Sequence, residues 1–209
     1  MHLFGLTGGI ATGKSTVAAR LRGKGVPILD ADALAREVVA PGTDGLRAVV
    51  ETFGASVLQP DGSLDRKGLA RVAFADPAAR RKLEAITHPR IGRLVMQGAA
   101  RYAALGEPLV CYEAALIVEN GMADAFRPLV VVACSPEVQL ARMQARDSAS
   151  AADAEARMRS QMSTAQKVAV ADHVIDTSGS LTQNAAQTDR MLAALCGAFG
   201  VDPRRYGLA

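Results

Sequence analysis

The residues most suited to chemistry form a glycine-rich segment near the N-terminus. Residues 8–15 read Gly-Gly-Ile-Ala-Thr-Gly-Lys-Ser and fit the pattern G-x-x-x-x-G-K-[ST] in full. Glycines let several backbone N–H groups face one anion, while a following helix and a lysine add positive charge. The pattern predicts a site for a nucleoside triphosphate, although a glycine-rich turn with an exposed lysine is the simpler alternative. The expected contacts are Gly9, Ala11, Thr12, Gly13, Lys14, Ser15 and Thr16, with the Ser15 hydroxyl on Mg²⁺.

Carboxylates follow two other apolar segments. Asp30 and Asp32 end a short strand-like run, and the carboxyl ends of parallel strands face the ligand crevice. We expect Asp32 to accept a proton from an acceptor hydroxyl. Asp30 either caps the next helix or contacts Mg²⁺ or its water. Glu113 ends the run Leu-Val-Cys-Tyr-Glu, where it is either a ligand to a Mg²⁺-bound water or an exposed strand terminus.

A polar, arginine-bearing segment, residues 142–171, has no strand pattern and predicts a helical flap. Arg142 and Arg146 are four residues apart and share one helix face. A guanidinium binds phosphoryl oxygens well, so we expect Arg142 to act on the transferred phosphoryl group and Arg146 to contact the nucleotide. A solvated basic face is the alternative.

Periodicity predicts alternating strands and helices, which is typical of an α/β fold with a parallel sheet. Five strands are expected, at residues 2–7, 26–30, 109–112, 129–134 and 173–175. Helices should run from the glycine-rich turn to about Gly23, from Ser135-Pro136 onward, and over residues 181–196. The tail from Pro203 is expected to be loose.

Residues 33–105 are too many for a simple crossover between strands and carry a helical pattern with two turns, which indicates a helical insert. We therefore expect one P-loop NTPase-type domain over residues 1–209. Its nucleotide-binding core comprises residues 1–32, 106–141 and 172–209, its insert residues 33–105, and its lid residues 142–171.

The composition of the 209 residues is that of an ordinary globular protein, with 49% hydrophobic and 22% charged residues. A net charge of +3, scattered Lys and Arg, and 4% aromatic residues argue against a nucleic-acid binder. No apolar run is long enough to span a bilayer, and the N-terminus has no signal-peptide pattern. We expect a cytoplasmic monomer without a membrane or nucleic-acid partner, whose Cys111, Cys134 and Cys196 are buried thiols.

A phosphate-binding loop alone does not distinguish a kinase from a GTPase or a switch protein. The guanine-reading pattern N-K-x-D is absent from the sequence. A candidate base, an insert and an arginine-bearing lid favour a small-molecule kinase. A nucleoside or nucleoside-monophosphate kinase follows the same plan, and a nucleotide-binding switch without an acceptor is the alternative from another class.

Taken together, these motifs resemble the dephospho-CoA kinase family over nearly the whole chain. The resemblance is carried by Gly5-Leu-Thr-Gly-Gly-Ile-Ala-Thr-Gly-Lys-Ser-Thr16, Asp30-Ala-Asp32, Leu83-Glu-Ala-Ile-Thr-His-Pro-Arg-Ile91, Arg146-Asp147, Ala156-Arg157, Gln161 and residues 171–179. It implies transfer of a phosphoryl group from ATP to the ribose 3′-hydroxyl of dephospho-CoA, with Mg²⁺.

The resemblance also implies roles for individual residues. It places a catalytic carboxylate at Asp32, acceptor contacts at Arg66 and His88, and lid contacts at Arg142 and Arg146. Adenine is expected near Thr177 and Gly179. His88 has a second interpretation, because Pro89 is suited to a first helical turn and His88 could cap a helix starting there.

Four positions depart from the usual family pattern. Glu113 and Ala115 stand where family members usually have Asp and Pro, which lengthens the carboxylate on the metal side and loosens the turn. Thr177 replaces a usual Asn, so an adenine contact there falls to the backbone. The usual Gly after Asp147 is missing, which affects the hinge of the lid.

Overall fold

The computed structural model describes residues 1–147 and 150–208. These residues form two compact units. We call residues 1–29 and 102–209 the core unit and residues 30–101 the helical unit. The two residues 148–149 of the predicted lid, including the position where the family's glycine is missing, lie outside the described residues.

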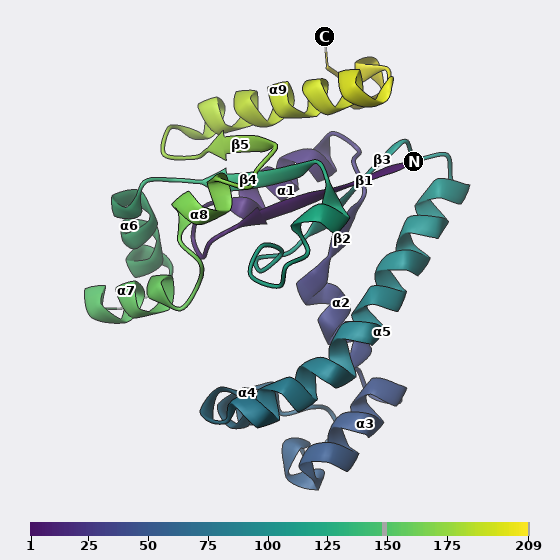
Figure 1. Cartoon of the computed structure of the whole chain (residues 1–209), viewed down its shortest axis with the longest axis vertical. Helices are drawn as coiled ribbons and strands as arrows, with labels where there is room; N and C mark the ends of the chain where they lie inside the picture. The colour runs from purple at the N-terminus through teal and green to yellow at the C-terminus, as the bar shows by residue number, and fades with distance from the viewer. Residues whose placement is uncertain (148–149, 209) are drawn as a thin grey trace. The chain divides into compact units, whose positions relative to one another are not determined.

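The predicted five-stranded parallel sheet is confirmed (Figure 1). Its strands are β1 (His2–Gly8), β2 (Ile28–Asp30), β3 (Leu109–Glu113), β4 (Leu129–Ala133) and β5 (His173–Asp176), in the order β2-β3-β1-β4-β5. β1 pairs in parallel with β3 and β4, with Leu6 opposite Glu113 and Val130. The second strand is shorter than expected because Pro27 has no N–H to donate, although its carbonyl accepts from Cys111.

One face of the sheet packs on α1 (Lys14–Gly23) and α9 (Leu181–Phe199), which contact each other (Figure 1). Phe4 and Leu6 of β1 alternate with residues of the other face, as the period of a strand requires. They are fully buried with Leu21 of α1 and Leu195 of α9. The core therefore fixes the strand and the helix that flank the glycine-rich loop.

The described residues of the flap are mainly helical, as expected. α6 (Pro136–Asp147) begins after Ser135, whose hydroxyl accepts from the Val138 N–H. α7 (Ala151–Arg159) and α8 (Thr164–Val168) follow, each with a serine N-cap. In the connection between β3 and β4, η2 (Ala123–Phe126) places Phe126 in a stacked contact with Tyr112.

The helical unit contains α2 (Ala31–Val38), α3 (Asp44–Phe53), η1 (Ala55–Val57), α4 (Arg66–Ala75) and most of α5 (Pro77–Ala104). Its own core includes Val38, Val49, Val57 and Leu69. α5 passes through Pro89 without ending. The expectation of a helix starting at Pro89 is therefore wrong, and His88 lies in the interior of α5 and does not cap a helix.

The helix starts at Pro77, where proline is well suited, and Asp76 accepts from the Ala78 N–H at 2.7 Å. Pro89 removes one helical hydrogen bond, which leaves a gap in the ladder at the preceding turn. Close to this gap, the Arg90 guanidinium donates to the Ile86 carbonyl at 2.8 Å. Packing of Leu83, Ile86, Ile91 and Leu94 against the core of the helical unit keeps the two halves of α5 together.

The C-terminal tail is not loose, contrary to the expectation. Residues 203–206 form η3 (Pro203–Tyr206), which Asp202 caps through the Arg204 N–H. Tyr206 is 2% exposed and Leu208 is 8% exposed, and both belong to the core beneath the sheet. The prediction followed the charged residues of this segment and overlooked two apolar side chains that complete the core.

Replacing Tyr206 with alanine is therefore expected to lower the free energy of unfolding by about 3–5 kcal/mol, because a large buried side chain is lost and a cavity remains. Urea unfolding of the variant measures the loss. Arg204→Ala, which removes a side chain that is 84% exposed, is the matched control and should change stability by less than about 0.5 kcal/mol. Equal stability of the two variants would restore the interpretation of a loose tail.

The three thiols are buried, as predicted. Burial raises the pKa of the Cys111 thiol well above its usual range, so this thiol stays protonated and unreactive. Across the described residues, no helix combines the length and the apolar character needed to cross a bilayer.

Candidate active site

The glycine-rich loop joins the end of β1 to the start of α1. Gly13 occupies the N-cap position of α1 with φ 87°, and no side chain caps this helix. Ala11 has φ 57°, a left-handed conformation that costs a non-glycine residue about 1–2 kcal/mol. Within the described residues, the N–H groups of Ala11, Gly13, Lys14 and Ser15 donate to no protein acceptor. The loop thus presents free amides at a helix N-terminus, which is the arrangement that binds a phosphate.

The close approach of neighbouring atoms explains two of the glycines. A Cβ on Gly8 would lie 2.7 Å from the Val132 carbonyl oxygen and 2.7 Å from the Thr12 hydroxyl. A Cβ on Gly13 would combine a left-handed φ with a distance of 3.3 Å to the Thr177 hydroxyl. Larger side chains at either position would displace the loop from the sheet.

Two glutamines hold the peptide groups of Ile10. The Ile10 N–H donates to Gln161 Oε1 at 2.9 Å, and the Ile10 carbonyl accepts from Gln139 Nε2 at 2.7 Å. Gln139 is a buried residue of α6, and Gln161 lies between α7 and α8. The start of α6 and the connection between α7 and α8 are therefore each joined to the loop by a hydrogen bond at Ile10, and the following amides are left available.

Lys14 is held by a carboxylate at the end of β3. Its Nζ lies 2.7 Å from Glu113 Oε1, and Arg22 NH2 lies 3.2 Å from Glu113 Oε2. The Glu113 side chain is only 7% exposed, whereas that of Arg22 is 48% exposed. Glu113 is thus not the exposed strand terminus that was the alternative. Its carboxylate faces the loop lysine and fixes the position of the ammonium.

Thr177 fastens the other side of the loop. Its buried hydroxyl lies 2.6 Å from the Thr12 carbonyl and 3.1 Å from the Ala133 carbonyl. Arg142 donates to the Thr177 hydroxyl at 3.0 Å and to the Thr177 carbonyl at 2.6 Å. The guanidinium of Arg142 therefore lies at the loop, next to Gly13, and Thr177 contributes to loop geometry through a side chain that faces inward.

Thr177→Val removes this hydroxyl while keeping the shape of the side chain. We expect the free energy of unfolding to fall by about 1–3 kcal/mol, because a carbonyl acceptor of Thr12 is left unsatisfied. We also expect weaker ADP binding, measured by titration calorimetry, because the loop loses a support. Thr177→Ser keeps the hydroxyl and is the matched control. If valine and serine variants bind ADP equally well, the hydroxyl has no role in the loop.

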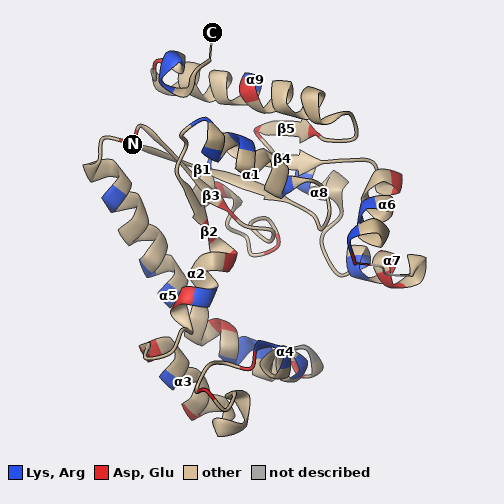
Figure 2. Ribbon diagram, turned by 180° about the vertical axis from the view of Figure 1, so that it is seen from behind, with Lys and Arg blue, Asp and Glu red and all other residues tan. Residues whose placement is uncertain are grey.

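The other flap arginines form a local ion network on α6 and α7, where acidic and basic positions lie together (Figure 2). Arg146 Nε lies 2.7 Å from Asp147 Oδ1, and Arg157 also pairs with Asp147. The hydrogen bond from Arg146, with a second from Arg157, lowers the pKa of Asp147 to about 2. Arg146 is exposed and paired, so its predicted contact with the nucleotide requires it to leave or share Asp147.

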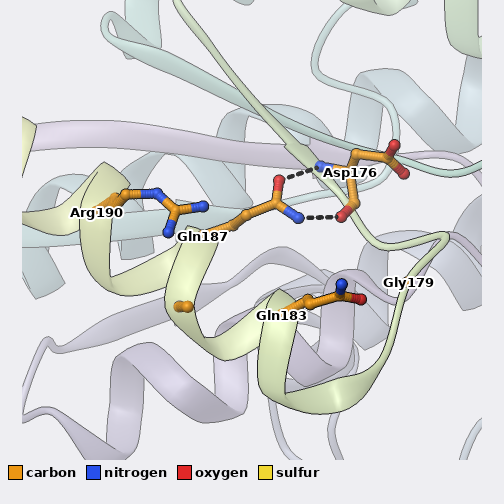
Figure 3. A pocket seen from close by; sticks show the side chains of 6 residues that line it. Asp176, Gly179, Gln183, Gln187 and Arg190 are labelled. Carbon is orange, nitrogen blue, oxygen red and sulfur yellow. Dashed lines mark hydrogen bonds between the residues drawn. The ribbon is translucent and has the colours of Figure 1, made fainter.

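Gly179 lies in a different setting from Thr177. A cavity of about 400 Å³ is lined by Gly179, Gln183 and Gln187, together with Asp176, Ala186 and Arg190 (Figure 3). A Cβ on Gly179 would lie 2.3 Å from Gln183 Oε1, which accepts from the Ser180 N–H in the capping box of α9. A side chain at position 179 would therefore push the Gln183 amide out of the capping box of α9, and contact with adenine stays a prediction.

The helical unit carries the acceptor-side candidates. Asp30 caps α2: its Oδ1 accepts from the Asp32 N–H at 2.9 Å and from the Ala33 N–H at 3.2 Å. Asp32 lies in the first turn of α2, and its side chain is exposed. The cap explains Asp30 and leaves the carboxylate of Asp32 directed to solvent and available to a ligand.

Arg66 and His88 are also exposed, at the first position of α4 and in the interior of α5. The sequence analysis did not find a cavity of about 220 Å³ in this unit, which Thr43, Asp44, Arg90 and Arg93 line with four other residues. Arg90 Nε lies 3.0 Å from Asp44 Oδ2. The spacing of residues in the sequence does not indicate that two arginines line one cavity.

Magnesium has a partial donor set in the core unit. Among the described residues, no group of three or more His, Cys, Asp or Glu side chains could hold a metal ion. The Ser15 hydroxyl is exposed in the first turn of α1, and the Glu113 carboxylate lies against Lys14. A hard cation that keeps most of its water and binds phosphate oxygens fits such a sparse set of ligands.

Sequence reasoning missed the residues that support the loop from a distance. Gln139 was not singled out, and Gln161 entered only as part of the family resemblance. Both residues are far from the loop in sequence, and a glutamine in a polar helix does not reveal which backbone group it will bind. Thr177 was expected at the nucleotide through its backbone, whereas its side chain supports the loop.

Comparison with known proteins agrees with this geometry. A family model described as dephospho-CoA kinase matches residues 2–183. A dephospho-CoA kinase of Anaeromyxobacter dehalogenans is 48% identical over 200 residues, covering 96% of this chain and 95% of that protein. A dephospho-CoA kinase of Geobacter metallireducens is 46% identical over 195 residues, covering 93% and 95% of the two chains.

Two solved structures have the same fold. The crystal structure of a Thermus thermophilus protein superposes with a TM-score of 0.80 at 35% identity, covering 93% of this chain and 98% of that one. A dephospho-CoA kinase from Campylobacter jejuni superposes with a TM-score of 0.71 at 24% identity, covering 93% and 97%. With matches of this identity along almost its whole length, the chain belongs to the dephospho-CoA kinase family.

Proposed function

We propose that this protein transfers the γ-phosphoryl group of ATP to the ribose 3′-hydroxyl of dephospho-CoA, forming CoA and ADP. The observation that carries the proposal is the loop at the start of α1, where, among the described residues, the amides of Ala11, Gly13 and Ser15 donate to no protein acceptor and Lys14 opens the helix. This arrangement binds the phosphates of a nucleotide. Membership of the family supports dephospho-CoA as the acceptor.

In this proposal the core unit binds ATP. Amides of the loop and the Lys14 ammonium bind the β- and γ-phosphates, for which Lys14 exchanges part of its contact with Glu113. Ser15, and Glu113 through water, are the residues that would hold Mg²⁺, which would neutralise charge on the phosphate oxygens. Arg142, already at the loop through Thr177, adds a guanidinium next to the bound nucleotide.

The helical unit supplies the acceptor side. Asp32 accepts the proton of the attacking 3′-hydroxyl, for which its exposed carboxylate is suited. Arg66 and His88 contact the acceptor, and closure of residues 142–171 excludes water, which would otherwise compete as acceptor. Catalysis comes mainly from positioning and charge neutralisation, since phosphoryl transfer requires little covalent chemistry from the protein.

Mass detection of CoA after incubation with Mg²⁺, ATP and dephospho-CoA tests the proposal. CMP and dTMP in the same assay test the nucleotide-kinase alternative, and phosphate release without any phosphorylated acceptor would indicate a switch protein. The proposal is supported if CoA is formed and neither CMP nor dTMP is phosphorylated. Omission of Mg²⁺ should abolish CoA formation. Size-exclusion chromatography of the protein alone should give the mass of a monomer.

A further inference from the structure

Lys167 of α8 is fully buried, which is rare for a lysine. Its side chain is 0% exposed, and lysine is almost never buried without a partner. Its Nζ donates to the Ala115 carbonyl at 2.7 Å and lies 2.7 Å and 2.9 Å from the two carboxylate oxygens of Glu119. An ammonium has three N–H groups, and three acceptors surround this one. Lys167 is therefore not available as a base or a nucleophile.

The partners of Lys167 join three segments of the core unit. Glu119 Oε1 also accepts from the Met162 N–H at 3.2 Å, and Met162 lies in the flap between α7 and α8. The Ala115 carbonyl also accepts from the Thr7 hydroxyl at 3.1 Å, and Thr7 is the residue before Gly8 of the phosphate-binding loop. The ammonium thus fastens the end of the flap to the segment after Glu113 and to the end of β1.

The residue next to Met162 reaches the loop itself. Gln161 Oε1 accepts from the Ile10 N–H at 2.9 Å. The backbone at Met162 is fixed by Glu119, and Glu119 is fixed by Lys167. The position of the Gln161 amide therefore depends on the ion pair, and so does the orientation of the Ile10 peptide, which precedes the free amides of Ala11 and Gly13.

We propose that Lys167 is a positioning residue for nucleotide binding: through Glu119, Met162 and Gln161 it sets the conformation in which the phosphate-binding loop presents its amides. The inference rests on the proposed function only in that the loop binds the phosphates of ATP. A purely structural ion pair would stabilise the fold without changing the affinity of correctly folded protein, so affinity separates the two roles.

Titration calorimetry with ADP, without any acceptor, tests the proposal on the full chain. We expect Lys167→Met to raise the Kd for ADP roughly 10- to 100-fold, as small misplacements of a binding group do. Gln161→Ala should raise the Kd as well. The Kd of the double variant should not exceed that of the weaker-binding single variant, because both changes act along one path. Lys167→Arg, which retains the charge, should recover most of the affinity.

Val49→Ala is the matched control, because it shortens a fully buried side chain of α3 that belongs to the core of the helical unit and has no place in this path. It should lower the melting temperature and leave the Kd for ADP unchanged. A Lys167→Met protein that melts early but binds ADP like the wild type would overturn the proposal, as would an additive effect of the two changes. If Lys167→Met does not fold, Glu119→Gln replaces it in the same cycle with Gln161→Ala.

The outcome does not depend on the acceptor. Wild-type protein that binds ADP but forms no CoA would contradict the proposed function while leaving the affinity of the Lys167 and Gln161 variants interpretable. Conversely, normal CoA formation with an unaltered ADP affinity in Lys167→Met would contradict only the positioning role.

Discussion

Asp32→Asn is expected to lower kcat for CoA formation by roughly 10²- to 10⁴-fold, the usual contribution of a general base. Asparagine has almost the same shape as aspartate but cannot accept the proton of the attacking hydroxyl. The Kd for ADP should stay close to that of the wild type, because the phosphate-binding residues are in the other unit. Steady-state kinetics with dephospho-CoA as the varied substrate, together with ADP calorimetry, measures both quantities.

Asp30→Asn is the companion variant. Asparagine caps helices as well as aspartate does, so α2 should begin at the same residue and kcat should change little. A large loss of kcat in Asp30→Asn would instead favour its other interpretation, a contact with Mg²⁺ or its water. Wild-type turnover by Asp32→Asn would remove Asp32 from the reaction and leave the proposed mechanism without an acceptor-side base.

The elements that could be predicted from sequence are those with a local cause. The first strand, the loop and α1 follow from an apolar run, a glycine pattern and the stop signals at Gly23 and Gly25. The start of α6 follows from the pair Ser135-Pro136. Asp30 as an N-cap was one of two local interpretations and is the one observed. In each case the residues that determine the structure are within a few positions of the structure itself.

Other features depend on contacts between distant segments, which a local pattern does not contain. Pro89 is typical of a helix start, but α5 continues through it because residues before and after Pro89 pack against the core of the helical unit. The tail reads as polar, but Tyr206 and Leu208 are buried by strands and helices far away in sequence. The supports of the loop are of the same kind, since Gln139, Gln161 and Thr177 lie more than 120 residues beyond it. The sequence therefore predicts which residues meet the phosphates, but it does not indicate which residues hold the loop in place.

Lys14→Met should reduce kcat/KM for ATP by at least roughly 10²- to 10³-fold, the loss that follows removal of one preorganised group from a developing negative charge. Methionine keeps the length of the side chain and removes its charge. The variant also leaves the Glu113 carboxylate with the Arg22 guanidinium, at 3.2 Å, as a cationic neighbour. We expect the free energy of unfolding to fall by about 1–3 kcal/mol, less than for a buried carboxylate with no cation at all.

The double variant Lys14→Met with Glu113→Gln separates the two roles of the lysine. A neutral amide at position 113 does not need a cation and can still accept from Arg22, so much of the lost stability should return. Activity should not return, because the γ-phosphoryl group still lacks its ammonium. Urea unfolding and CoA formation measured on the same preparations give both answers. Recovery of turnover along with stability would mean that Lys14 serves only to neutralise Glu113, and the loop would then bind phosphate through its amides alone.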